Sequence, residues 1–292
     1  MDILITGANG QLGREIADVL QAGATDIGPI PDVYAGAHVV GVGHAELDIS
    51  DRQAVDAFMA GRHFDVIFNC AARTDVDGCE SDPMGARRAN AVGPQVLALA
   101  ARARDCKLVH ISTDYVFDGT KDAPYVETDI PNPQTAYGKS KLEGELLVSN
   151  IWGRHCIVRT SWLYGTHGGN FPKTMLRLAR ERGAIKVVDD QRGNPTYAND
   201  LAHEVLKLAA ADVYGMFHCT GEGTCSWYEF ACAVVDAAGI SCTKEPCSSA
   251  EFPRPARRPA NSALENKHLA DTVGNEMRPW RAALESFLAK TL

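Results

Sequence analysis

The chain has 292 residues, which is enough for a full hydrophobic core in one large domain or in two fused ones. Its formal net charge of −8 and its lack of a basic run argue against a nucleic-acid-binding protein. No apolar stretch reaches the length of a membrane span, and Met1 leads directly into a predicted strand rather than into a signal peptide. We therefore expect a cytoplasmic protein that binds neither nucleic acid nor membrane.

The first half of the chain alternates between predicted strands and predicted helices. Short apolar runs predict strands at 2–6, 39–42, 65–69, 107–112 and 155–160. Helical patterns begin at Leu12, after a cap at Ser50, at Pro83 and near Tyr137. This β-α-β series predicts an α/β fold, a Rossmann-like doubly wound parallel sheet with helices on both faces. The long connection at 23–36 is expected to be a surface excursion.

The second half is expected to form a smaller and more helical lobe. We predict helices at 170–182, 199–211 and 227–238 and a strand at 184–188. Ser226 and Glu229 have the spacing of a capping box for the third of these helices. The segment 252–259 is broken by prolines and is therefore expected to be a loop. We predict a dinucleotide-binding domain at 1–161 and a substrate-binding lobe at 162–292, with some segments interleaved.

A glycine-rich turn follows the first predicted strand. Its spacing is Gly-x-x-Gly-x-x-Gly, and a helical pattern comes directly after it. Between a strand and a helix, such glycines let the backbone approach a pyrophosphate, which sits on the helix N-terminus. The alternative interpretation is a plain turn that caps the helix. The loop residues that we predict to bind a dinucleotide are Gly7, Asn9, Gly10, Gln11, Leu12 and Gly13.

Tyr137 and Lys141 are four residues apart, so on a helix they share one face. An ammonium beside a phenol favours the anionic form, and such a tyrosine can exchange a proton with a carbinol or carbonyl oxygen. Thr113 follows the fourth predicted strand, where ligands of open α/β sheets bind, and its hydroxyl can hydrogen-bond a substrate oxygen. The alternatives are an ordinary helix surface for the pair and a turn cap for Thr113.

Longer segments carry a family likeness, namely 6–13, 69–77, 112–119, 137–145, 159–165, 169–171, 173–179, 190–196 and 258–262. In these segments, and over nearly its whole length, the chain resembles the dTDP-4-dehydrorhamnose reductase family of extended short-chain dehydrogenase/reductases. The resemblance implies that a nicotinamide hydride reduces the C4 keto group of dTDP-4-dehydro-L-rhamnose to give dTDP-L-rhamnose. It also implies a nucleotide-sugar substrate and a role in polysaccharide biosynthesis.

The same resemblance implies roles for individual residues. Tyr137 would protonate the incipient alkoxide, Lys141 would hold the nicotinamide ribose and lower the pKa of Tyr137, and Thr113 would hydrogen-bond the sugar oxygen. Further residues implied at the cofactor are Asp48, Ile49, Ala71, Ala72 and Thr74. Those implied at the substrate are Val76, Asp114, Tyr115, Trp162 and Arg258, the last as a phosphate ligand. The alternatives are a solvated Arg258 and a Trp162 that belongs only to the core.

The expected cofactor is NADPH, with NADH as a possible second donor. The second strand ends near Gly43 without the carboxylate that would bond the ribose hydroxyls of NAD. Some members of the family bind magnesium through carboxylates at a dimer interface. Glu15 is retained here, but Asn199 stands where a carboxylate is expected. We therefore predict no metal site, and a monomer or homodimer. The cysteines between 219 and 247 lack a tight ligand spacing, so we expect free thiols there.

Two other functions remain open at this point. One is a nucleotide-sugar epimerase or another nucleotide-sugar 4-ketoreductase, which would share the fold and the Tyr137/Lys141 pair. The other is a non-catalytic, NADP-binding regulatory subunit of methionine adenosyltransferase. The presence of Thr113, Tyr137 and Lys141 argues against the regulatory subunit, which has no need of these three groups.

Overall fold

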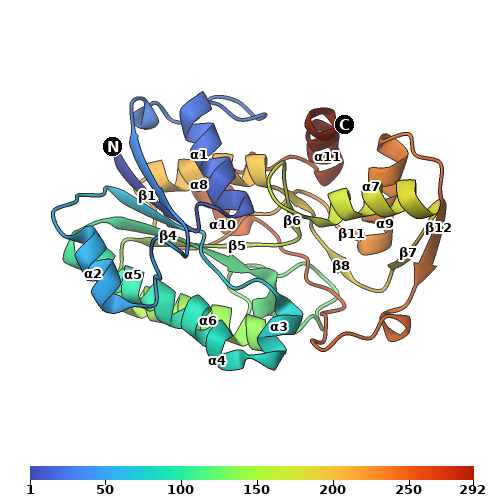
Figure 1. The fold of residues 1–292 in the computed structure, drawn as a ribbon, viewed down its shortest axis with the longest axis horizontal. Coiled ribbons are helices and arrows are strands. Elements are labelled where there is room, and N and C mark those ends of the chain that lie inside the picture. The colour runs from blue at the N-terminus through green and yellow to red at the C-terminus, as the bar shows by residue number, and fades with distance from the viewer.

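The computed structural model describes residues 1–292, and its centre is a six-stranded parallel sheet (Figure 1). The strand order is β10-β5-β4-β3-β1-β2, which confirms the predicted Rossmann-like α/β fold. The order of the strands reverses between β1 and β3, and the carboxyl ends of these two strands flank the crevice where such sheets bind ligands. The strands are β1 (Asp2–Thr6), β2 (His38–Val42), β3 (Val66–Asn69), β4 (Lys107–Thr113), β5 (His155–Thr160) and β10 (Gly215–His218).

Helices cover both faces of this sheet (Figure 1). One face packs against α1 (Gln11–Ala22) and α8 (Ala198–Ala210), and the other against α2 (Arg52–Met59), α5 (Gly93–Ala103) and α6 (Ala136–Ile151). Successive side chains of β1 alternate between the two layers, because Ile3 and Ile5 join the α1/α8 side while Leu4 joins the α2/α5 side. The apolar run of β1 is therefore explained by burial on both faces.

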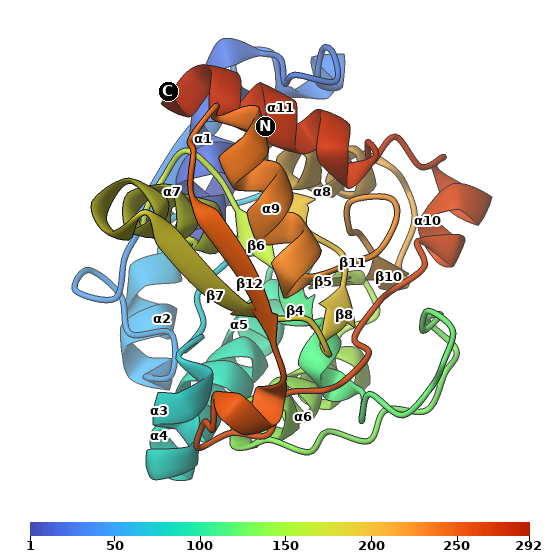
Figure 2. The same cartoon turned by 90° about the vertical axis from the view of Figure 1, so that its right-hand side faces the viewer.

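The remaining long elements form a second packed layer beyond the carboxyl edge of the sheet (Figure 2). It contains α7 (Phe171–Arg182), β7 (Ala184–Val188), α9 (Trp227–Ala237), β12 (Thr243–Cys247) and α11 (Trp280–Thr291), which share one hydrophobic core. The predicted capping box at Ser226 and Glu229 is confirmed at the start of α9. Both β10 and α8 come from the second half of the chain but complete the central sheet and its cover.

Shorter elements connect these layers. They are α3 (Val76–Ser81), α4 (Pro83–Arg87), α10 (Lys267–Thr272), β6 (Leu163–Tyr164), β8 (Arg192–Gly193), β9 (Thr196–Tyr197), β11 (Cys225–Ser226), and the single turns η1 (Asp32–Tyr34), η2 (Arg88–Val92), η3 (Asp114–Val116) and η4 (Ser249–Glu251). No helix has the combination of length and apolar character that would carry it across a bilayer.

Two local predictions were wrong, and a third was incomplete. Asp51 rather than Ser50 caps α2, because its side chain accepts the backbone N–H groups of Gln53 and Ala54. The long helix predicted from Pro83 is divided by the π-helical turn η2. The 23–36 segment is not simply a surface excursion, because Tyr34 is buried and its hydroxyl donates to the Leu206 carbonyl at 2.8 Å.

Candidate active site

The glycine-rich loop passes between the carboxyl ends of β1 and β3. Gly7 has a φ of 69°, and a Cβ there would lie 2.6 Å from the backbone nitrogen of Ala71. A Cβ on Gly13 would lie 2.4 Å from the Gly7 carbonyl oxygen. Only glycine fits these two positions, since no real Cβ approaches a neighbour so closely. The bare backbone and the N-terminus of α1 leave room for a pyrophosphate there.

Helix α6 places Tyr137 and Lys141 beside the end of β4. The Thr135 hydroxyl caps the helix by accepting the Gly138 N–H at 3.0 Å. A Cβ on Gly138 would lie 2.1 Å from the carbonyl oxygen of Tyr115, so the first turn of α6 presses directly against the turn that follows β4. Tyr137 and Lys141 are 8% and 1% exposed, and the ring of Tyr137 meets that of Tyr115 edge to face at 5.6 Å.

Burial controls the protonation of this pair. It raises the pKa of Tyr137 above the ordinary value, although a hydrogen bond with Thr113 partly opposes the effect. Burial also lowers the pKa of Lys141 to about 8, against the opposing charge of Glu145. The Lys141 ammonium donates to the Ile111 carbonyl at 2.6 Å. The predicted lowering of the Tyr137 pKa is therefore not what the structure has, because desolvation of the phenolate dominates. Tyr137 is a neutral phenol near neutral pH, and a neutral phenol can donate a proton.

Thr113 and Asp114 lie at the mouth of the same site. The Thr113 hydroxyl donates to Oδ1 of Asp114 at 2.9 Å. Burial raises the pKa of Asp114 to about 6, although the nearby hydroxyls of Ser262 and Thr113 oppose this rise. Oδ2 of Asp114 is buried and has no protein partner. This oxygen is thus an acceptor that the protein itself leaves unused.

A buried ion pair between Glu145 of α6 and Arg159 of β5 stabilises the position of the helix that carries Tyr137. Glu145 and Arg159 are 2% and 3% exposed, and the guanidinium donates to both carboxylate oxygens at 2.9 and 2.7 Å. The Ser112 hydroxyl also donates to Glu145, at 2.5 Å. These bonds join α6, β5 and β4 directly behind Lys141 and Thr113. They hold the helix that carries Tyr137 against the two strands.

Two adjoining cavities, of about 590 and 580 Å³, contain every predicted site residue except Arg258. The first is lined by Gly7, Asn9, Gly10, Asp48, Ile49, Ala71 and Ala72. The second is lined by Asn9, Gly10, Gln11, Leu12, Gly13, Ala72, Thr74, Val76, Thr113, Asp114, Tyr115, Tyr137, Lys141 and Trp162. The two cavities share four lining residues, so they adjoin at the glycine-rich loop.

Arg258 lies elsewhere. It lines a third cavity of about 530 Å³, which shares Tyr115 and Trp227 with the cavity of Tyr137. Its guanidinium contacts the Asp77 carboxylate at 3.0 Å. The sequence predicted Arg258 as a substrate ligand but gave no sign of this carboxylate partner, which lies 181 residues away in the chain.

Sequence reasoning missed Trp227. Its ring lies face to face on Trp162, with the ring centroids 3.6 Å apart and the planes 8° from parallel. Trp162 has a φ of 46°, which is strained for a bulky side chain. The stacking contact with Trp227 offsets part of the cost of this backbone conformation. Nothing local signals this role, because Trp227 reads as an ordinary first-turn residue of α9.

Charged groups also gather at the first cavity, and sequence reasoning missed two of them, Glu46 and Arg88. The Glu46 carboxylate accepts the Gly43 N–H at 2.8 Å, so an acidic group lies at the end of β2 although the strand itself carries none. Arg88 donates to Asp48 at 2.7 Å. Arg73 lines the same cavity and pairs with a carboxylate of its own, Asp82. Acidic and basic groups are thus mixed at this end of the site.

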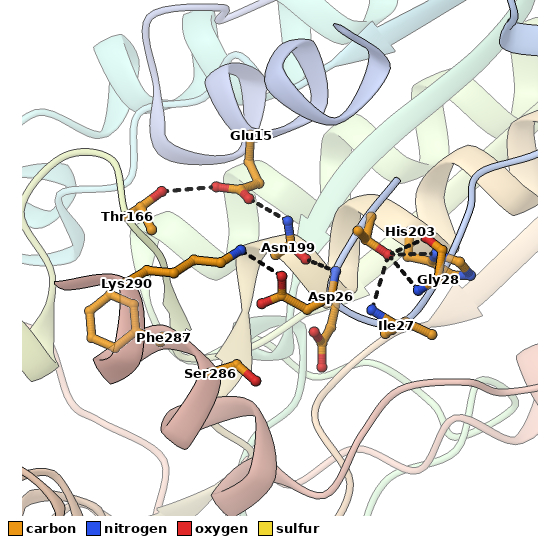
Figure 3. A network of polar contacts seen from close by, with 12 residues as sticks. Glu15, Asp26, Ile27, Gly28, Thr166, Asn199, His203, Ser286, Phe287 and Lys290 are labelled. Carbon is orange, nitrogen blue, oxygen red and sulfur yellow. Dashed lines mark hydrogen bonds and ion pairs between the residues drawn. The ribbon is translucent and has the colours of Figure 1, made fainter. Parts of the chain in front are cut away.

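The residues around Glu15 do not fit a magnesium ion. Figure 3 shows Asn199 facing Glu15, and its amide nitrogen donates to Oε1 at 2.7 Å. The amide oxygen of Asn199 accepts the Asp26 N–H at 2.7 Å, and Lys290 reaches the Asp26 carboxylate at 2.5 Å. Magnesium requires oxygen ligands, whereas here an amide N–H and an ammonium face the two carboxylates. No group of three or more His, Cys, Asp or Glu side chains is placed to hold a metal ion.

The glycine-rich loop at the switch point of the sheet and the buried Tyr137/Lys141 pair beside it define the short-chain dehydrogenase/reductase class. The RmlD substrate binding domain family matches residues 1–292. The chain is 40% identical to the dTDP-4-dehydrorhamnose reductase of Aggregatibacter actinomycetemcomitans, over 98% of each chain.

Solved structures agree with the sequence relatives. The fold is similar to that of a dTDP-4-dehydrorhamnose reductase from Clostridium acetobutylicum, with a TM-score of 0.94 and 45% identity over 99% of each chain. It is also similar to the Bacillus anthracis enzyme of that name solved in complex with NADP, with a TM-score of 0.93 and 37% identity over 99% of each chain. The chain belongs to the dTDP-4-dehydrorhamnose reductase family, a family of oxidoreductases.

Proposed function

We propose that the protein reduces the C4 keto group of dTDP-4-dehydro-L-rhamnose to give dTDP-L-rhamnose, with NADPH as the preferred donor and NADH as the alternative. The observation that carries this proposal is a buried, neutral Tyr137 in a cavity that adjoins the cavity under the glycine-rich loop. Family membership supports the substrate, and the NADP complex of the Bacillus anthracis relative supports the cofactor.

Each step falls to a residue of this chain. The hydride for C4 would come from a reduced nicotinamide held by the glycine-rich loop and Lys141. Tyr137 donates its phenolic proton to the C4 oxygen as negative charge develops there, and it recovers a proton from solvent afterwards. Thr113 would turn its hydroxyl from Oδ1 of Asp114 to the same oxygen and so favour the developing charge. Lys141, one helical turn further along α6, binds the nicotinamide ribose through its ammonium group.

The lining residues divide between the two ligands. We propose that Asp48, Ile49, Ala71, Ala72 and Thr74 contact the cofactor, as do the loop residues 7–13. Val76, Asp114, Tyr115 and Trp162 would contact the sugar nucleotide. In the same scheme, residues 1–161 mainly bind the dinucleotide and residues 162–292 mainly bind the substrate, although β10 and α8 belong to the central sheet.

The direct test follows the oxidation of NADPH, and then of NADH, by the purified protein with dTDP-4-dehydro-6-deoxyglucose. Oxidation that requires added 3,5-epimerase supports the proposal and identifies the donor. Oxidation without the epimerase indicates a different 4-ketoreductase. Cofactor binding without any oxidation favours a nucleotide-sugar epimerase or a regulatory subunit over the reductase.

Tyr137→Phe tests the proton donor. We expect kcat to fall by about 10²- to 10⁴-fold, because general acid catalysis is lost, while NADPH binding persists. Tyr34→Phe is the matched control, since it also removes a buried tyrosine hydroxyl but lies outside the two cavities of the site. A Tyr137→Phe variant with near-normal kcat would show that another group supplies the proton.

A further inference from the structure

The loop at 252–259 contains no helix or strand, yet the carboxylate of Asp77 in α3 binds it to the first half of the chain. Asp77 lies in the first turn of α3. Its Oδ1 accepts the Ala256 N–H at 3.1 Å, and its Oδ2 accepts from Nη2 of Arg258 at 3.0 Å. The two side chains of this pair are only 26% and 21% exposed. Asp77 thus connects segments that are about 180 residues apart in the chain.

The contact between Asp77 and the loop lies at a cavity with several cationic side chains. Lys186, Arg254 and Arg258 line the third cavity, whose only lining carboxylate is Asp77, although Lys186 also pairs with Glu251 at 2.7 Å. This cavity shares Tyr115 and Trp227 with the cavity that holds Tyr137. A long ligand with its sugar at Tyr137 can therefore extend past these two aromatic residues, and its next part would meet the cationic groups.

The Arg258 guanidinium has N–H groups that are available to bind such a ligand. A guanidinium carries five N–H donors in a fixed fork. Asp77 takes one through Nη2, and the Ala256 carbonyl takes another through Nη1 at 3.2 Å. These two bonds fix the orientation of the fork and leave the other N–H groups free of protein partners. Burial opposes the ionisation of Asp77, but the Ala256 N–H and the Arg258 and Arg254 charges outweigh it and hold the Asp77 pKa below its usual value.

We propose that Asp77 is a positioning residue that fixes the 252–259 loop and thereby presents the Arg258 guanidinium to the diphosphate of the substrate. This inference rests on the proposed function for the identity of the ligand, a sugar nucleotide diphosphate. Asp77 itself touches no reacting atom, because its two oxygens are occupied by the loop.

Kinetics of Asp77→Ala and Asp77→Asn test the proposal. We expect the KM for the nucleotide sugar to rise about tenfold in both, as for the loss of one charge-assisted hydrogen bond, while kcat stays within about threefold of wild type. Asp77→Asn retains an oxygen for the Ala256 N–H and covers the case in which the alanine variant fails to fold. The matched control is Asp271→Asn, which breaks an exposed ion pair with Lys267 outside these cavities. An unchanged KM, or a lower KM that would make Asp77 a competitor of the diphosphate, overturns the proposal.

Limited trypsin digestion gives a readout that does not depend on turnover. Arg257 is exposed, and it is the only arginine of the loop that is not followed by proline, so trypsin would cut after it. We expect faster cleavage there in Asp77→Ala than in wild type, and protection of wild type by thymidine diphosphate. Equal cleavage of the two proteins would contradict the claim that Asp77 fixes the loop, even if the wild-type enzyme is active. A third outcome is possible: the variant is cleaved faster, but the wild-type enzyme shows no turnover and thymidine diphosphate gives no protection. This result would refute the proposed ligand, and it would support only the contact between Asp77 and the loop.

Discussion

Replacing Glu145 with glutamine tests the support beneath the active site. The substitution removes the negative charge from a pair whose members are 2% and 3% exposed, and it leaves Arg159 buried without a counter-charge. Loss of one partner from a buried pair costs about 3–5 kcal/mol. The unfolding entropy of a 292-residue chain is about 0.6 kcal/mol/K, so the melting temperature should fall by about 5–8 °C.

The same substitution should change catalysis through Lys141. Glu145 lies one helical turn from Lys141 and opposes the fall of its pKa. Without that charge, the Lys141 ammonium should lose its proton below pH 8, and the alkaline limb of kcat/KM should move to lower pH. Scanning calorimetry and a pH profile of kcat/KM measure the two effects on the same samples.

Glu143→Gln is the matched control. Glu143 is on the same helix and forms a bidentate pair with Arg87, but its side chain and that of Arg87 are 36% and 48% exposed. Pairs this exposed contribute about 0–1 kcal/mol. If Glu145→Gln lowers the melting temperature no more than Glu143→Gln does and leaves the pH profile unchanged, the buried Glu145–Arg159 pair contributes neither the expected stability nor the expected effect on the pKa of Lys141.

Three further outcomes are expected. In the wild-type enzyme, kcat/KM should decline as pH rises through about 8, where Lys141 loses its proton. Because burial lowers the pKa of Lys141 from 10.5, the folded protein should gain stability as pH rises from about 8 to 10.5, where the folded state has lost this proton and the unfolded state still binds it. A flat profile to pH 10 would contradict that assignment. Gly13→Ala should weaken NADPH binding by at least about tenfold, as followed by nucleotide fluorescence, whereas Gly28→Ala, whose Cβ meets nothing within 4 Å, should bind normally. Neither EDTA nor added magnesium should shift the melting temperature, because Asn199 presents an N–H to Glu15, and a fall with EDTA would show that the chain does hold a metal.

Local sequence patterns predicted most of the fold. The apolar runs of the first five strands, the glycine-rich turn and the capping box of α9 are all encoded within a few residues, and the structure places them within two residues of the prediction. The strands β10 and β12 and the helix α11 were missed. In β10 only Met216 and Phe217 are apolar, and its place beside β5 depends on a contact far along the chain.

The sequence by itself thus determined the alternating strands and helices of the first half of the chain, and it placed Tyr137 and Lys141 on a common helical face. Tertiary structure alone decided the partners: Glu145 with Arg159, Trp162 with Trp227, and Asp77 with Arg258. It also decided that burial raises the pKa of Tyr137, whereas the four-residue spacing from Lys141 had led us to expect a lower pKa. The physical reason is that periodicity and capping act over one or two turns, whereas desolvation and long-range pairing depend on how distant segments are packed together.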